Sequence, residues 1–142
     1  MKKLILFAFA VFMVTGLAAQ QKEVVKFNEK THDFGTVKEE DGRITCTFSF
    51  DNLLATPISI KNVRASCGCT TPNWSREPIA PNAKGEITVT YNTKGRPGMF
   101  QKSVTVTFSD GTQDYTQVLF IKGKVTPRVV ATPAPATQPA TK

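Results

Sequence analysis

The sequence predicts an all-β protein, an immunoglobulin-like β-sandwich of about seven antiparallel strands. Apolar residues alternate with threonine and serine at a period of two, as in the segment 43–51. Asp-Gly pairs at Asp41 and Asp110 mark turns between such runs. No stretch between the two termini has helical periodicity, and short strands at this spacing are typical of a sandwich, with a small barrel as the alternative.

The first residues have the features of a secretory signal peptide over 1–19. Two lysines precede an unbroken apolar run over 4–14, and the small residues of 15–19 suit cleavage. The rival interpretation is an uncleaved anchor, but the run is shorter than the roughly 20 residues that a spanning helix needs. We therefore expect an exported protein, periplasmic or secreted, with no transmembrane segment in the mature chain.

Seven segments with the strand pattern follow in order. They are 24–27, 34–37, 43–51, 57–63, 86–91, 102–108 and 115–125. The last is the longest, and its apolar run over 118–121 predicts burial on both sides of the sheet. Together they predict one domain over 24–126. The remaining residues, 127–142, are rich in proline, alanine and threonine and predict a disordered tail.

The charge of the chain is basic but dispersed. Its 142 residues carry a formal net charge of +7, from 18 Lys and Arg against 11 Asp and Glu. The basic residues form no dense run, so a solvated surface explains them better than nucleic-acid binding does. We expect the partner to be a protein or another component of the cell envelope, and not nucleic acid.

The most distinctive motif is Ser66-Cys67-Gly68-Cys69-Thr70, which lies between two strand-patterned runs. Gly68 permits a tight turn that brings the two cysteines together, so a disulfide between them is one interpretation. Two free thiols in a structural loop, a soft-metal site for Cu(I), and a thiol–disulfide redox pair are the others. Met99 and His32 are candidates to complete a metal site, although no pattern places them nearby. The total of three cysteines is odd, so Cys46, on an apolar strand face, is expected to be a buried free thiol unless it pairs with one of the other two.

Several motifs together resemble one bacterial family, DUF1573, over residues 24–126. The resemblance is carried by segments 31–37, 48–52, 66–72, 79–81 and 85–91, with Gly98 beyond them. It implies an extracytoplasmic domain related to the Hydin-like and PapD-like immunoglobulin folds. It implies no reaction, because the family has no assigned one.

No catalytic constellation is visible, and we expect neither enzymatic activity nor a cofactor. His32 is the single histidine and is expected to be a turn or strand-edge residue bonded to the backbone. Trp74 is expected either to pack against the domain or to serve as a binding anchor. The predicted binding residues are therefore Cys67, Gly68, Cys69, Thr70 and Trp74, with Cys67 and Cys69 as the metal ligands if a metal binds. The sequence predicts an exported binding or scaffolding module, with a Cu(I)-handling protein as the alternative.

Overall fold

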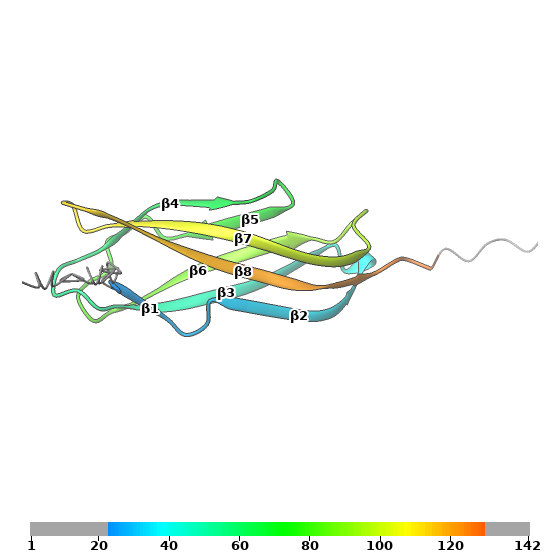
Figure 1. The fold of residues 1–142 in the computed structure, drawn as a ribbon, viewed down its shortest axis with the longest axis horizontal. Coiled ribbons are helices and arrows are strands. Elements are labelled where there is room, and N and C mark those ends of the chain that lie inside the picture. Colours follow the sequence, from blue (N-terminus) through cyan, green and yellow to red (C-terminus); the bar gives the residue numbers. More distant parts are fainter. Residues whose placement is uncertain (1–22, 130–142) are drawn as a thin grey trace, which may run out of the picture.

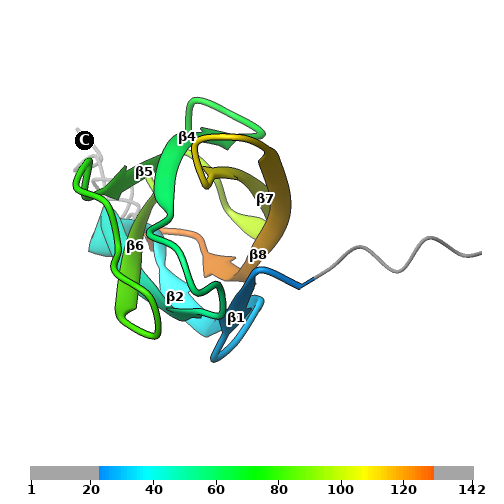
Figure 2. The ribbon, with the colours of Figure 1, turned by 90° about the vertical axis from the view of Figure 1, so that its left-hand side faces the viewer.

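The computed structural model describes residues 23–129 and shows two four-stranded β-sheets packed face to face (Figures 1 and 2). The first sheet has the order β1-β3-β6-β5, with β1 Val25–Phe27, β3 Arg43–Asn52, β6 Lys84–Asn92 and β5 Thr70–Trp74. The second has the order β2-β8-β7-β4, with β2 Thr31–Lys38, β8 Asp114–Thr126, β7 Gly98–Ser109 and β4 Ser59–Ala65. A single 3-10 turn, Glu39–Asp41, connects β2 to β3. The predicted immunoglobulin-like sandwich is confirmed.

The structure corrects two details of the predicted fold. Within residues 23–129 there are eight strands and not seven, because Thr70–Trp74 forms an additional strand, β5, at the edge of the first sheet. Not all neighbours are antiparallel, because β2 runs parallel to β8. The predicted signal peptide and residues 130–142 of the predicted tail lie outside the described residues. No helix within the described part is long and apolar enough to cross a membrane.

In the long last strand, β8, exposed and buried side chains alternate. Val118 is 39% exposed, whereas Leu119 and Ile121 are fully buried. The prediction that 118–121 is buried on both sides is therefore wrong. Within residues 23–129 no further layer covers the outer face of the second sheet, so only every second residue of β8 enters the core.

The core lies between the two sheets and is rich in aromatic rings. Phe50 packs against Phe27 and Phe108 with ring centroids 5.2 and 5.1 Å apart. Tyr91 stacks on Phe100 at 4.1 Å, which joins the first sheet to the second. Each such ring buries a large apolar area, so these contacts contribute strongly to the core.

Two of these rings lie directly over glycines on the neighbouring strand. Phe50 pairs with Gly85 across β3 and β6, and Phe100 pairs with Gly123 across β7 and β8. A side chain at either glycine would meet the ring of its partner. Because glycine has no side chain, these two positions leave room for the rings inside the sandwich.

The outer edge of β5 is poorly suited to pairing with a further strand. Asn92 donates its backbone N–H to the Cys69 carbonyl, so these two residues form a hydrogen-bonded pair of the antiparallel ladder. Because hydrogen-bonded and non-hydrogen-bonded pairs alternate, the backbone groups of Thr70, Pro72 and Trp74 point away from β6. Proline has no N–H to offer at that edge, and proline at such a position is a usual protection against strand addition.

Gly85→Ala is expected to destabilise the domain by about 1–3 kcal/mol, because the added methyl group must displace the Phe50 ring in a packed core. Gly68→Ala is the matched control, since its added methyl group would have no atom within 4 Å. Urea unfolding of both variants measures the difference. Equal midpoints for the two would contradict the packing described for Phe50.

Candidate functional site

Asn52 shapes the surface beside β5 from within the core. Its side chain is fully buried at the end of β3. The Nδ2 group lies 3.0 Å from the Thr56 carbonyl oxygen and 3.1 Å from those of Ile79 and Ala80, while Oδ1 accepts the Leu54 N–H at 2.9 Å. The amide thereby holds both the connection after β3 and the connection 75–83 in fixed positions.

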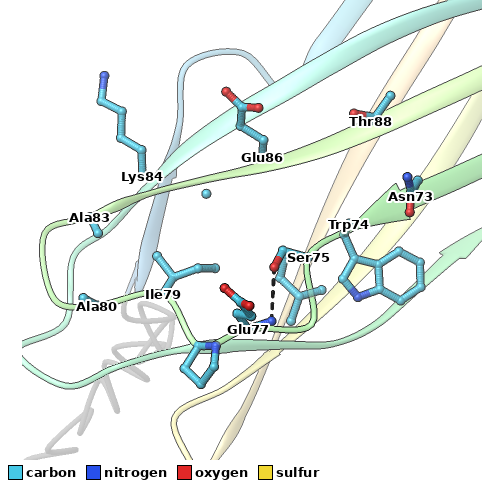
Figure 3. A pocket seen from close by; sticks show the side chains of 13 residues that line it. Asn73, Trp74, Ser75, Glu77, Ile79, Ala80, Ala83, Lys84, Glu86 and Thr88 are labelled. Atoms are coloured by element: carbon cyan, nitrogen blue, oxygen red, sulfur yellow. Dashed lines mark hydrogen bonds between the residues drawn. The ribbon is translucent and has the colours of Figure 1, made fainter.

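The connection 75–83 and the strands beside it enclose a groove of about 570 Å³ (Figure 3). Trp74 lies toward one end, and Ala80 and Ala83 lie toward the other. The groove is lined by Ile60, Asn73, Trp74, Ser75, Glu77, Pro78, Ile79, Ala80, Ala83, Lys84, Gly85, Glu86 and Thr88. A hydrogen bond from the Glu77 N–H to the Ser75 Oγ, at 3.1 Å, tightens the first turn of the connection. The groove therefore combines apolar contacts with polar and charged groups.

Trp74 is the half-buried aromatic residue of this groove. The Arg76 guanidinium carbon lies 4.5 Å from the centre of its ring, in a cation–π contact. Its Nε1 is buried and has no hydrogen-bond partner within residues 23–129. A buried donor without an acceptor is rare in native proteins and costs free energy. Trp74 therefore packs against the domain, which was one of the two predictions for it. Its Nε1–H is an unsatisfied hydrogen-bond donor.

The cysteine motif forms the connection from β4 to β5, and so it crosses from the second sheet to the first (Figure 1). Ser66 donates its N–H to Ser103 of β7 at 2.9 Å, and Asn92 of β6 donates to the Cys69 carbonyl at 2.9 Å. Each end of the connection is therefore held by its own sheet. Between these ends, Cys67 and Cys69 are joined by a disulfide, with their Cα atoms 5.3 Å apart. Of the interpretations open at the sequence level, the structure contains the Cys67–Cys69 disulfide.

Thr70 lies beneath this disulfide. Only 4% of the residue is exposed. Its Oγ1 is 3.6 Å from the Cys67 Sγ and 3.9 Å from the Cys69 Sγ, and these sulfurs are its only hydrogen-bond partners in the described part of the chain. A hydroxyl group in this position can donate to either sulfur.

The third cysteine is separate from the motif. Cys46 is a free thiol on the inner face of β3, 6% exposed. Burial, with a smaller contribution from the Glu29 carboxylate, raises the pKa of the Cys46 thiol to about 12. It is therefore neutral at physiological pH and unreactive while the domain is folded.

The residues considered for a metal site do not gather around the cysteines. The Nδ1 of His32 lies 2.9 Å from a Glu29 carboxylate oxygen, and its ring packs edge-on against Phe34. Met99 is 81% exposed and lies opposite Lys124, four residues before the Ser103 that holds the cysteine connection. No cluster of three His, Cys, Asp or Glu side chains within residues 23–129 could hold a metal ion. In the disulfide, moreover, the two thiolates that Cu(I) would need are absent.

The predicted binding residues thus divide into two places on one strand. Cys67, Gly68, Cys69 and Thr70 lie together at the start of β5, and Trp74 lies at its end, roughly 13 Å away at the rise of an extended chain. Asn52 was not among the predicted binding residues, although the sequence contains a signal for its role. Asn52 continues the inward phase of Phe48 and Phe50, and a polar residue at an inward position must find partners inside the protein.

Fold and site define an immunoglobulin-like β-sandwich with a disulfide-closed connection on one edge and a groove beside it. Residues 25–125 match the family described as "Protein of unknown function (DUF1573)". The chain belongs to this family, as the sequence motifs predicted. No curated protein matches it.

Solved structures with the same fold come from distant proteins. A Porphyromonas gingivalis W83 protein of unknown function is 14% identical, with a TM-score of 0.58 over 71% of this chain and 46% of its own. The Vibrio cholerae VesB protease is 12% identical, with a TM-score of 0.61 over 71% of this chain and 32% of its own. WR4, a Caenorhabditis elegans MSP family member, is 9% identical, with a TM-score of 0.51 over 72% of this chain and 97% of its own. The match spans less than half the length of the first two, and identities this low show the fold alone.

Alkylation of the native protein without reductant is expected to modify no cysteine, because Cys46 is buried and the other two are bonded. After unfolding without reductant one label is expected, and after unfolding with reductant all three cysteines react. Intact-mass spectrometry counts the labels. Three labels on the unfolded, unreduced protein would contradict the disulfide.

Asn52→Ala is expected to lower the free energy of unfolding by at least about 2 kcal/mol, because it removes all four hydrogen bonds of a fully buried side chain and leaves a cavity in its place. Asn62→Ala, at an exposed position of β4, is the matched control and should change stability by no more than about 0.5 kcal/mol. Urea unfolding followed by circular dichroism compares the two. Similar midpoints for both variants would show that the Asn52 amide does not hold the connection.

Proposed function

We propose that the protein is a non-enzymatic binding module of the cell envelope, and that it holds a short segment of a partner protein in the groove beside Trp74. The observation that carries this proposal is the half-buried indole of Trp74, which lines the groove and has an unsatisfied Nε1. Tryptophan is among the residues that most often dominate binding energy at protein interfaces. The Nε1 itself is buried, so a bound segment would pack against the part of the indole ring that remains exposed in the groove.

The shape of the groove supports a peptide as the occupant. Apolar contacts from Trp74, Ile79 and Ala80 suit one side chain of a bound segment, and the carboxylates of Glu77 and Glu86 offer acceptors for its backbone N–H groups. The connection that forms one wall is fixed by Asn52, so little ordering is needed when a partner binds. The neighbouring strand edge is a poorer site, because Pro72 removes a donor from it.

We propose the periplasm or the exterior of the cell as the location of this binding, which the export signal expected from the sequence supports. Activity as a Cu(I)-handling protein remains a prediction that requires the reduced Cys67 and Cys69 thiols, and no contact in residues 23–129 favours it over the groove. An enzymatic role would be supported instead by turnover of an envelope substrate that Cys67→Ser or His32→Ala abolishes.

A photo-crosslinking residue at Ser75, in the groove, is expected to capture a defined partner in intact cells. The same residue placed at Met99 is the control, because Met99 is 81% exposed on the opposite sheet. The Ser75 adduct should disappear when Trp74 is also changed to alanine, which removes the indole but leaves Asn52 and its bonds in place. An adduct that persists in Trp74→Ala, or that forms equally from Met99, would contradict the groove as the binding site.

Because Trp74 is the single tryptophan of the chain, its fluorescence reports on the groove directly. Titration of the purified protein with a peptide taken from the captured segment should change the emission of Trp74 in a saturable way. A captured segment that leaves the emission unchanged would show that the partner binds elsewhere.

A further inference from the structure

We propose that the Cys67–Cys69 disulfide is an exchange site that dithiols of the cell envelope open and close while the domain stays folded. The substrate class is a dithiol, either a small molecule or a protein with a reduced cysteine pair. The proposal rests on the chemistry around the cysteine connection and is independent of what the groove binds.

The bond contributes little as a structural staple. A single residue, Gly68, separates the two cysteines, so closing this ring removes little entropy from the unfolded chain. Both ends of the connection are held without it, through Ser66 to Ser103 and through Cys69 to Asn92. Opening the disulfide therefore leaves each end of the connection bonded to its own sheet, and it leaves the core between the sheets unchanged.

The connection is open to an incoming thiol. Gly68 is exposed, and a side chain placed there would have no atom within 4 Å. The two cysteines beside it are only partly buried, although Cys69 packs in part against the core. Cys46, by contrast, is 6% exposed within the core and is not available to compete for the bond.

Thr70 supplies the group that favours the reduced form. Its hydroxyl reaches both sulfurs and has no other partner in the described residues, as the contacts above show. A disulfide sulfur is a weak acceptor, whereas a thiolate is a strong one, so the same hydroxyl stabilises the product of reduction more than the starting bond. The shorter contact, 3.6 Å, is to Cys67, which makes the Cys67 sulfur the better leaving group.

The exchange proceeds in two steps. A thiolate of the donor attacks the Cys69 sulfur, the Cys67–Cys69 bond breaks, and Cys67 leaves as a thiolate that the Thr70 hydroxyl stabilises. The second thiol of the donor then attacks the mixed disulfide and releases Cys69. Two electrons and two protons pass to the protein, which gains two thiols, and the donor is oxidised to its own disulfide. The reverse sequence closes the bond again and reduces an oxidised donor.

The test is reduction of the full exported protein by about 1 mM dithiothreitol at neutral pH, with thiols counted by alkylation and mass spectrometry. Two thiols should appear while circular dichroism and the emission of Trp74 keep their folded values. Reduction that occurs only in denaturant would overturn the proposal. This outcome leaves the Ser75 crosslinking result unaffected, so the two proposals can fail separately.

Thr70→Val tests the role assigned to the hydroxyl, because it keeps the shape of the side chain and removes the donor. We expect reduction about tenfold slower than in the unmodified protein and a higher pKa of the first thiol to ionise. Thr70→Ser, which retains a hydroxyl, should restore both, and Thr71→Val, exposed on the next residue, should change neither. Equal rates for Thr70→Val and Thr71→Val would overturn the assignment of Thr70.

Discussion

The buried side chain of Asn52 is the interaction on which the rest of the site depends. An amide at a fully buried position must have partners for both its donor and its acceptor, and here they come from two different connections of the chain. The backbone of Asn52 adds to this, since its N–H donates to the Ala83 carbonyl and its own carbonyl accepts from Asn82. The connection 75–83 is therefore held by several hydrogen bonds, although its only paired residue is Ile79, which forms an isolated bridge with Ile58. A groove with one such wall is largely preformed, which lowers the entropy lost on binding.

The same constraint explains why β5 can carry chemistry at both of its ends. The strand is short and lies at an edge, but its first residue follows a connection held by both sheets and its last residue leads into the connection held by Asn52. Thr70 and Trp74 share the inward phase of the strand, so one faces the disulfide and the other lines the groove. Pro72, between them, removes one donor from the outer edge of β5, which makes that edge a poorer site for strand addition.

Much of this architecture could be predicted from the sequence, because the period-two pattern depends only on which face of each strand is buried. The strand β5 was not predictable in this way, since Thr70–Trp74 contains a proline and no run of alternating apolar residues. It becomes a strand because the cysteine connection brings it alongside the edge of β6, with which it pairs. The parallel pairing of β2 with β8 likewise depends on where the chain crosses between the sheets, which local sequence does not specify. In the site, the cysteine motif could be predicted from the sequence. The distance of Trp74 from this motif could not, because it depends on the extended conformation of β5.

The two places on β5 are energetically separable. The hydrogen bonds between β5 and β6, over Thr70–Trp74, join backbone groups, and none of them involves a cysteine sulfur. Opening the disulfide therefore removes none of these bonds. The groove, in turn, is formed by the end of β5, by β6 and by the connection that Asn52 holds, and neither cysteine lines it. A change in the redox state of Cys67 and Cys69 can therefore occur without reshaping the surface beside Trp74. This independence means that a partner bound in the groove can remain bound while the cysteine connection exchanges with a dithiol.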